Sequence, residues 1–232
     1  MLKHYKTNRM GEIDALRGMA IILMVIFHTI VDLKEFYHYP VNYHNGFWYY
    51  LGKSSASLFI FLSGLSATLA TSHIRHGSRI FCCGLALTII TWFYSPDWYI
   101  RFGILHFLGI SLITYPLLNK QKPGTLLLLA IFAVLLGNWA ADQIVPWPLL
   151  IPLGLLPDGF QTLDYYPLFP WYGIFLIGAA FGKHFYQSGT SLFPDVVFPQ
   201  PLTFLGRHSL AIYLTHQPLL LVFLYGLHHV IK

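Results

Sequence analysis

Charged and titratable residues recur on one face of a long apolar segment near the start of the chain, residues 14–32. At about 100° per residue, Asp14, Arg17, His28 and Asp32 share one side of a helix, with Met24 among them. An ionisable group at bilayer depth costs about 2.5–3.5 kcal/mol on insertion scales, so lipid is a poor neighbour for this face. The pattern predicts a membrane helix whose polar side lines a cavity formed by protein or water.

His28 and Asp32 have a spacing that suits catalysis. The carboxylate lies one helical turn beyond the histidine, where it can hold one imidazole nitrogen and leave the other facing the cavity. Such an imidazole can act as a general base or as a nucleophile. The alternative is a histidine that is simply satisfied within the helix packing.

Arg17 precedes His28 by eleven residues, which is about 16 Å along a helix and only about 20° away in direction. Arg17 is therefore expected near one membrane surface, with His28 deeper. Two functional ends on one helix suggest a ligand that enters from one side and reacts toward the other. The alternative is that Arg17 snorkels to the interface.

Two later segments carry further candidate residues. In GRHSLAIYLTHQP, Ser209, Tyr213 and His216 fall on one helix face, and His216 is expected at a depth comparable with that of His28. His216 and its neighbour Gln217 either line the site or form hydrogen bonds between helices. In YIRFGILHFLGIS, Arg101 is expected at the outer mouth, with His106 about 7 Å deeper.

The composition excludes an ordinary soluble domain. Hydrophobic residues make up 56% of the chain and charged residues only 10%, whereas soluble domains carry about 25% charged residues. The net charge of +5 does not indicate nucleic-acid binding, because the basic residues are spread over short loops between apolar runs. We expect an integral membrane protein.

Apolar runs near the span length of about 20 residues predict an all-α, polytopic membrane protein with about seven transmembrane helices. No hydrophilic tract marks a second domain, so we expect a single domain over residues 1–232. The proline-rich and aromatic segment 142–167 is predicted to be a re-entrant or interface-hugging cover. The expected helices span residues 14–32, 48–73, 78–94, 102–119, 124–141, 168–186 and 207–230.

The distribution of basic residues predicts a cytoplasmic N-terminus. With that orientation, ten of the 14 lysines and arginines face the cytoplasm and four face outward, as the positive-inside rule requires. We therefore expect a multi-pass protein of the inner cell membrane. The inner set is Lys3, Lys6, Arg9, Arg17, Arg75, Arg79, Lys120, Lys122, Lys183 and Arg207.

Motifs for several other chemistries are missing. There is no HExxH and no cysteine-bearing zinc spacing, so we expect no metal site despite twelve histidines. GxGxxG, GxxxxGK and GxSxG are also absent, which removes support for nucleotide binding by those routes and for hydrolase chemistry.

Four segments together resemble the heparan-alpha-glucosaminide N-acetyltransferase catalytic-domain family: IDALRGMAIILMVIFH, RFGILHFLGIS, FPWYGIFLIGAAFGK and GRHSLAIYLTHQP. The spacing of Arg17 and His28 also resembles a motif of family-three membrane acyltransferases. The resemblance implies a multi-pass enzyme that takes an acetyl group from cytoplasmic acetyl-CoA. It would deliver the group to an amine or hydroxyl of a glycan on the far side of the membrane.

The resemblance also implies roles for residues. His28 would deprotonate the acceptor or carry the acyl group itself, with Asp32 orienting it. In the lysosomal members the position of His28 is an asparagine, and the catalytic histidine lies in the following outer segment, so His44 is the reserve candidate beside His38. The expected coenzyme-binding residues are Arg17, Arg207, Ser209, His216, Arg101 and His106, with Arg75, Arg79 and Lys183 adding positive charge at the inner mouth.

Two other classes of function stay open at this point. A small transporter or proton-coupled permease would use buried histidine and aspartate as relay groups. A structural subunit would have no turnover. The expected partners of the acyltransferase are the lipid bilayer, acetyl-CoA and a glycan acceptor, and a homodimer is possible.

Overall fold

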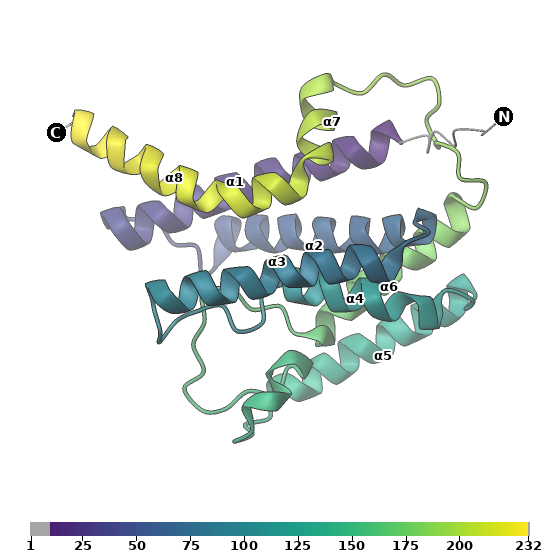
Figure 1. The fold of residues 1–232 in the computed structure, drawn as a ribbon, viewed down its shortest axis with the longest axis horizontal. Coiled ribbons are helices and arrows are strands. Elements are labelled where there is room, and N and C mark those ends of the chain that lie inside the picture. Colours follow the sequence, from purple (N-terminus) through teal and green to yellow (C-terminus); the bar gives the residue numbers. More distant parts are fainter. Residues whose placement is uncertain (1–9, 232) are drawn as a thin grey trace. The chain divides into compact units, whose positions relative to one another are not determined.

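The computed structural model describes residues 10–231, and within them the chain is helical, with isolated β-bridges and no strand (Figure 1). Helix α1 begins directly before the polar stripe and ends at Tyr37, and the φ of 56° at its capping residue His38 lies in the left-handed region. The elements are α1 (Gly11–Tyr37), α2 (Gly46–Leu69), α3 (His73–Tyr94), α4 (Ile104–Leu118), α5 (Pro123–Ala141), the 3-10 helix η1 (Pro148–Leu153), α6 (Leu168–Phe185), α7 (Gln200–Arg207) and α8 (Ser209–Ile231).

Each of the seven predicted ranges contains one long helix, which confirms the all-α fold. The start of the last range was wrong, because the helix breaks at His208 and α7 precedes it as a separate element. Helix α7 starts with Pro201 in its first turn and is too short and too polar to register as an apolar run.

Within residues 10–231, four helices are long and apolar enough to cross a membrane: α1, α3, α5 and α8. Helix α4 is apolar but shorter. The total of seven spans and the cytoplasmic N-terminus stay predictions. Of the basic residues on which the orientation depends, Lys3, Lys6 and Arg9 of the inner set and Lys232 of the outer set lie outside the described residues.

The chain divides into two compact units. The first contains residues 1–59 and 190–232, and the second contains residues 60–189, so α2 contributes to both. The expectation of a single domain over the whole chain stays a prediction.

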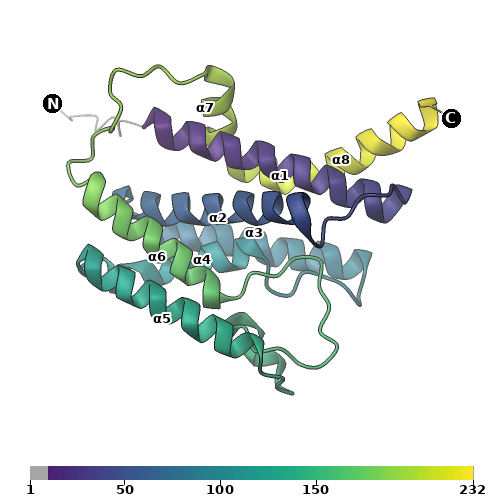
Figure 2. The same cartoon turned by 180° about the vertical axis from the view of Figure 1, so that it is seen from behind.

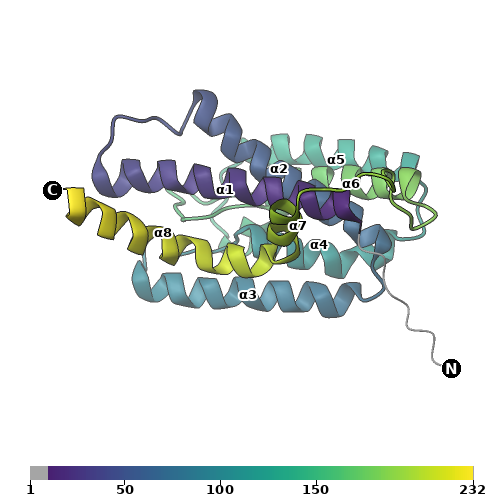
Figure 3. The same ribbon diagram turned by 90° about the horizontal axis from the view of Figure 1, so that it is seen from above.

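In the first unit α1 packs against both α7 and α8, and α1 and α8 run side by side (Figure 3). Glycines allow α7 to approach closely: a Cβ at Gly18 would collide with the Leu202 carbonyl, and one at Gly206 would collide with the Asp14 carbonyl. The first half of α2 is joined to α1 by the Ser55 hydroxyl, which donates to the Ala20 carbonyl at 2.9 Å. Helix α1 is therefore the central element of this unit.

In the second unit α3 packs against α4, and α5 packs against α6 (Figure 2). Small residues again set the closest crossings, since a Cβ at Gly64 would strike the Phe175 carbonyl and one at Gly178 would strike the Phe61 carbonyl. These close approaches are typical of helix packing in membranes, where van der Waals contact replaces the hydrophobic effect.

The segment 142–167 is ordered rather than a bare loop. It contains η1, and an isolated bridge joins Phe102 to Tyr165. The Thr162 hydroxyl donates to the Tyr99 carbonyl at 2.8 Å. This segment therefore pairs with the residues that lead into α4. Its predicted place at the membrane interface stays a prediction.

Candidate active site

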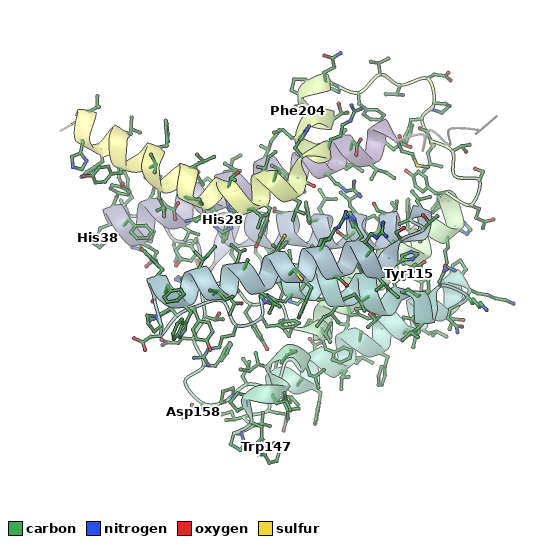
Figure 4. The ribbon with its side chains drawn as sticks, viewed as in Figure 1. His28, His38, Tyr115, Trp147, Asp158 and Phe204 are labelled. Carbon is green, nitrogen blue, oxygen red and sulfur yellow. The ribbon has the colours of Figure 1, made fainter. Side chains whose placement is uncertain are left out.

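Two histidines from α1 and α8 meet in the first unit. The rings of His28 and His216 have their centroids 4.8 Å apart, in an edge-to-face arrangement. His216 is buried, and the labelled His28 lies midway along α1, where α8 passes (Figure 4). The predicted meeting of the first and last long helices at these two residues is thus seen in the structure.

Asp32 does not hold His28 as predicted. Its Oδ1 accepts a hydrogen bond of 2.7 Å from the Gln217 side-chain amide, and its Oδ2 has no partner. Asp32 is only 1% exposed, so the amide of Gln217 is the group that stabilises this carboxylate. The predicted His28–Asp32 pair is replaced by an Asp32–Gln217 pair that ties α1 to α8.

The contact between α1 and α8 leaves several buried polar atoms unsatisfied. Asp32 Oδ2, Gln217 Oε1 and His216 Nε2 are buried and have no hydrogen-bond partner within the described residues. An unsatisfied buried polar atom costs about 1–3 kcal/mol, so three in one helix contact call for an explanation. A polar ligand or water that donates hydrogen bonds would satisfy them.

Arg17 and Arg207 share one carboxylate at the other end of this contact surface. Arg207 Nε lies 3.2 Å from Asp14 Oδ2, and Arg17 Nη1 lies 3.6 Å from Asp14 Oδ1. Asp14 is buried, whereas the side chains of Arg207 and Arg17 are 48% and 26% exposed. Ser209 begins α8 two residues beyond Arg207. Two guanidinium groups and one carboxylate leave a net positive site that suits a phosphate.

His44 lies in the connection between α1 and α2 and is exposed. Its ring packs on Tyr43 at 4.2 Å, and its backbone N–H donates to Asn42 Oδ1. Tyr43 donates its hydroxyl to Glu35, and burial together with this contact raises the pKa of Tyr43 to about 12. The tyrosine therefore stays protonated near neutral pH. His38, the other histidine of this segment, is also exposed.

Arg101 belongs to the second unit, in the residues that lead into α4. Its guanidinium carbon lies 5.0 Å from the centre of the Tyr99 ring and 5.3 Å from that of Phe160, within the range of cation–π contacts. Its backbone N–H donates to the Thr162 hydroxyl. These contacts fix the arginine against the segment that covers the start of α4.

His106, also in the second unit, has both ring nitrogens engaged. Nδ1 accepts a hydrogen bond from the Gly103 N–H at 3.2 Å, and Nε2 lies 3.2 Å from the Thr88 hydroxyl. Because the Thr88 hydroxyl donates to the Ile100 carbonyl, its oxygen accepts the proton on Nε2. His106 therefore joins α3 to the start of α4, and both of its ring nitrogens are used in that contact rather than in binding a ligand.

Acidic residues at the start of α1 have roles that the sequence reasoning missed. Glu12 is buried and accepts hydrogen bonds from the Ser191 hydroxyl and the Leu192 N–H. Asp14 bridges Arg17 and Arg207. The three-residue spacing of Asp14 and Arg17 was a visible signal for one of these pairs. Neither partner of Glu12 could be read from spacing.

Groups of three or more histidine, cysteine or acidic side chains that could hold a metal ion do not occur among residues 10–231.

The predicted site residues fall into four places. His28, Asp32 and His216 lie where α1 meets α8, and Arg17 and Arg207 both contact Asp14, with Ser209 nearby in sequence. His44 lies in the connection between α1 and α2. Arg101 and His106 lie in the second unit.

Comparison with known proteins identifies one family. The profile described as "Heparan-alpha-glucosaminide N-acetyltransferase, catalytic" matches residues 9–218, which include both α1 and the first half of α8. No curated protein and no solved structure matches the chain significantly. The matched range covers most of the 232 residues, and the chain therefore belongs to the heparan-alpha-glucosaminide N-acetyltransferase catalytic-domain family.

Proposed function

We propose that this membrane acyltransferase moves an acetyl group from acetyl-CoA to an amine or hydroxyl of a glycan. The donor binds on the cytoplasmic side of the inner cell membrane, and the acceptor binds on the opposite side. The family supplies the general activity, and the apolar helices supply the membrane setting. The donor, the acceptor and the orientation are our proposal.

The observation that carries the proposal is the pairing of His28 with His216 beside unsatisfied acceptor atoms. An imidazole pair next to Asp32 and Gln217, with His216 buried and His28 half-buried, provides groups that can take a proton. The unfilled acceptors suit an amine or a hydroxyl, since both donate hydrogen bonds. An apolar substrate would leave these atoms unsatisfied.

Arg17 and Arg207 bind the phosphates of the coenzyme in this proposal. Their guanidinium groups are held by Asp14, and the side chains of Arg17 and Arg207 are 26% and 48% exposed. Arg17 lies about 16 Å from His28 along α1, and an extended thioester arm can span this length. The phosphates would stay at the charged end while the acetyl group reaches the histidines.

His28 either deprotonates the acceptor or carries the acetyl group as an intermediate. Both routes form a bond from the acceptor to the acetyl carbon, break the carbon–sulfur bond and release coenzyme A as a thiol. His44 is the reserve candidate.

Transfer of label from acetyl-CoA into product tests the histidines. We expect His28→Ala to abolish transfer while the protein stays folded, as judged by its thermal transition. Full activity in His28→Ala, together with loss in His44→Ala, would instead move the chemistry to the connection between α1 and α2.

Coenzyme binding separates the enzyme from a permease or a structural subunit. A ligand that binds only the folded state raises the unfolding temperature, so acetyl-CoA should stabilise the purified protein. We expect Arg17→Ala and Arg207→Ala to weaken this stabilisation more than they slow the chemical step. An absence of stabilisation in the wild type would favour a proton-coupled permease that uses the same buried residues as relay groups.

A further inference from the structure

His216 is held in one tautomer. Its Nδ1 lies 2.7 Å from the Tyr213 carbonyl oxygen, which can only accept a hydrogen bond. Nδ1 therefore carries the proton in the neutral ring, and Nε2 carries a bare lone pair. That lone pair is buried and has no partner within the described residues. The Tyr213 carbonyl of α8 thus fixes the tautomer in which the buried Nε2 is unprotonated and can accept a proton.

Two other histidines show that burial distinguishes His216. Nδ1 of His208 lies 2.9 Å from the Phe204 carbonyl, and Nδ1 of His229 lies 2.9 Å from the Tyr225 carbonyl. Both residues are exposed, so water can satisfy their second nitrogen. In His216 the contact is to the carbonyl three residues earlier, and the bare nitrogen is buried on a ring whose centroid lies 4.8 Å from that of His28.

Among residues 10–231, no hydrogen bond positions the His28 ring as the Tyr213 carbonyl positions His216. Its predicted partner, Asp32, is bonded to Gln217, and the His28 ring packs against the rings of Phe27 and His216. A general base needs a second group that fixes its tautomer and supports the positive charge of the imidazolium. The Tyr213 carbonyl does this for His216, because it accepts from Nδ1 in both protonation states.

We propose that His216 is the general base of acetyl transfer, acting through Nε2. This inference rests on the proposed function and assigns the proton step within it. The acceptor nitrogen or oxygen loses its proton to Nε2 as it bonds to the acetyl carbon. In direct transfer the proton then passes to the departing thiolate of coenzyme A. If His28 carries the acetyl group, its own ring proton goes to the coenzyme A thiolate when the acetyl group is taken up, and the proton on Nε2 later passes to the departing imidazolate of His28.

The assignment gives the proton step to His216 in place of His28, and it holds whether the acetyl group passes directly to the acceptor or by way of His28. In both routes, the acceptor must lose one proton in the step that joins it to the acetyl group. Asp32 Oδ2 and Gln217 Oε1 are further acceptor atoms of the same helix contact, and they suit a group that donates more than one hydrogen bond. They would orient the acceptor while Nε2 removes the proton.

The test compares His216→Asn with His229→Asn in the full-length protein. Asparagine can keep a donor near the Tyr213 carbonyl but lacks the distal basic nitrogen. We expect kcat for labelled acetyl transfer to glucosamine, used as probe acceptor, to fall about 100- to 10,000-fold in His216→Asn. The KM for acetyl-CoA should change less than about twofold, and added imidazole should restore part of the rate to His216→Ala. His229→Asn, altered at an exposed position of the same helix, should match the wild type.

Three outcomes would overturn the assignment. Wild-type turnover together with an undiminished kcat in His216→Asn would reject His216 as the base and leave the proposed function standing. Loss confined to KM would show that His216 only binds the coenzyme. A wild-type protein that neither binds acetyl-CoA nor transfers its acetyl group would overturn the proposed function itself, and this inference with it.

Discussion

The two units of the chain each bury a histidine, and the two histidines differ in what their nitrogens contact. His106 in the second unit uses both nitrogens, one with the Gly103 N–H and the other with the Thr88 hydroxyl. His216 in the first unit uses one nitrogen and buries the other without a partner. The two side chains have similar exposures, 3% and 8%, so burial alone does not separate them.

This difference shows that a buried ring nitrogen without a hydrogen-bond partner is a better indicator of a ligand-binding or catalytic role than the burial of a histidine alone. A fully bonded buried ring stabilises its surroundings, because every polar group that lost water has found a replacement. A ring with an open lone pair beside other unfilled acceptors is less stable than it could be. This loss of folding stability from unsatisfied polar atoms is typical of sites that bind a ligand.

The largest expected effect on stability comes from His106→Ala. The substitution removes a ring packed near Phe81 and Phe102 and leaves the buried Gly103 N–H without its acceptor. We expect the free energy of unfolding to fall by about 3 kcal/mol or more. Thermal unfolding of the purified protein in detergent measures this loss.

His208→Ala, at an exposed position, is the matched control and should change stability by less than about 0.5 kcal/mol. Acetyl transfer per folded molecule should survive in His106→Ala. The comparison between the two histidines fails if His106→Ala leaves stability unchanged and instead raises the KM for acetyl-CoA.

Gln217→Leu should have the next largest effect. It removes the donor to Asp32 and leaves a buried carboxylate without a hydrogen bond. A hydrogen bond to a charged group is worth about 1.5–3 kcal/mol, so unfolding should become easier by about that amount. Chemical denaturation of the wild type and the variant gives the difference.

Asp32→Leu in the Gln217→Leu background is the diagnostic second step. It should recover stability, because removing both polar partners leaves no unpaired group. Thr215→Val, at an exposed position of the same helix, should have little effect. If Asp32→Leu instead lowers stability further, the Asp32–Gln217 bond is not what holds α1 to α8.

Asp14→Ala should give the smallest change in stability. The partner side chains are 26% and 48% exposed, so water and salt screen the two ion pairs, and we expect a loss of about 1 kcal/mol or less. The KM for acetyl-CoA should nevertheless rise a few-fold, because Arg17 and Arg207 lose the group that holds them together. Steady-state kinetics with Asp158→Ala as an exposed control measures this. A fall in kcat at constant KM would contradict the role.

Helix positions were predictable because apolar run length and polar spacing are local properties of the sequence. The stripe through His28 and Asp32 predicted one face of α1, and the His216 segment was correctly expected near it. The short helix α7 was not predicted, because it has no long apolar run, although it positions Arg207 next to Asp14.

Hydrogen-bond partners were harder to predict. Asp32 lies one turn from His28 on the same helix, yet it bonds to Gln217 on another helix, because the packing of α1 against α8 decides which donor arrives. The tautomer of His216 depends on a carbonyl of its own helix, and the structural role of His106 depends on Gly103 and Thr88. Spacing along a sequence carries no information on such choices between competing partners.

A double-mutant cycle on His28 and His216 tests the central claim most directly. We would measure kcat/KM for labelled acetyl transfer in the wild type, His28→Ala, His216→Ala and the double variant. Residues that act as one catalytic unit give losses that do not add, so the double variant should be about as slow as the slower single variant. Losses that multiply as for independent sites, or single variants as active as the wild type, would contradict the claim that the contact between α1 and α8 is the active site.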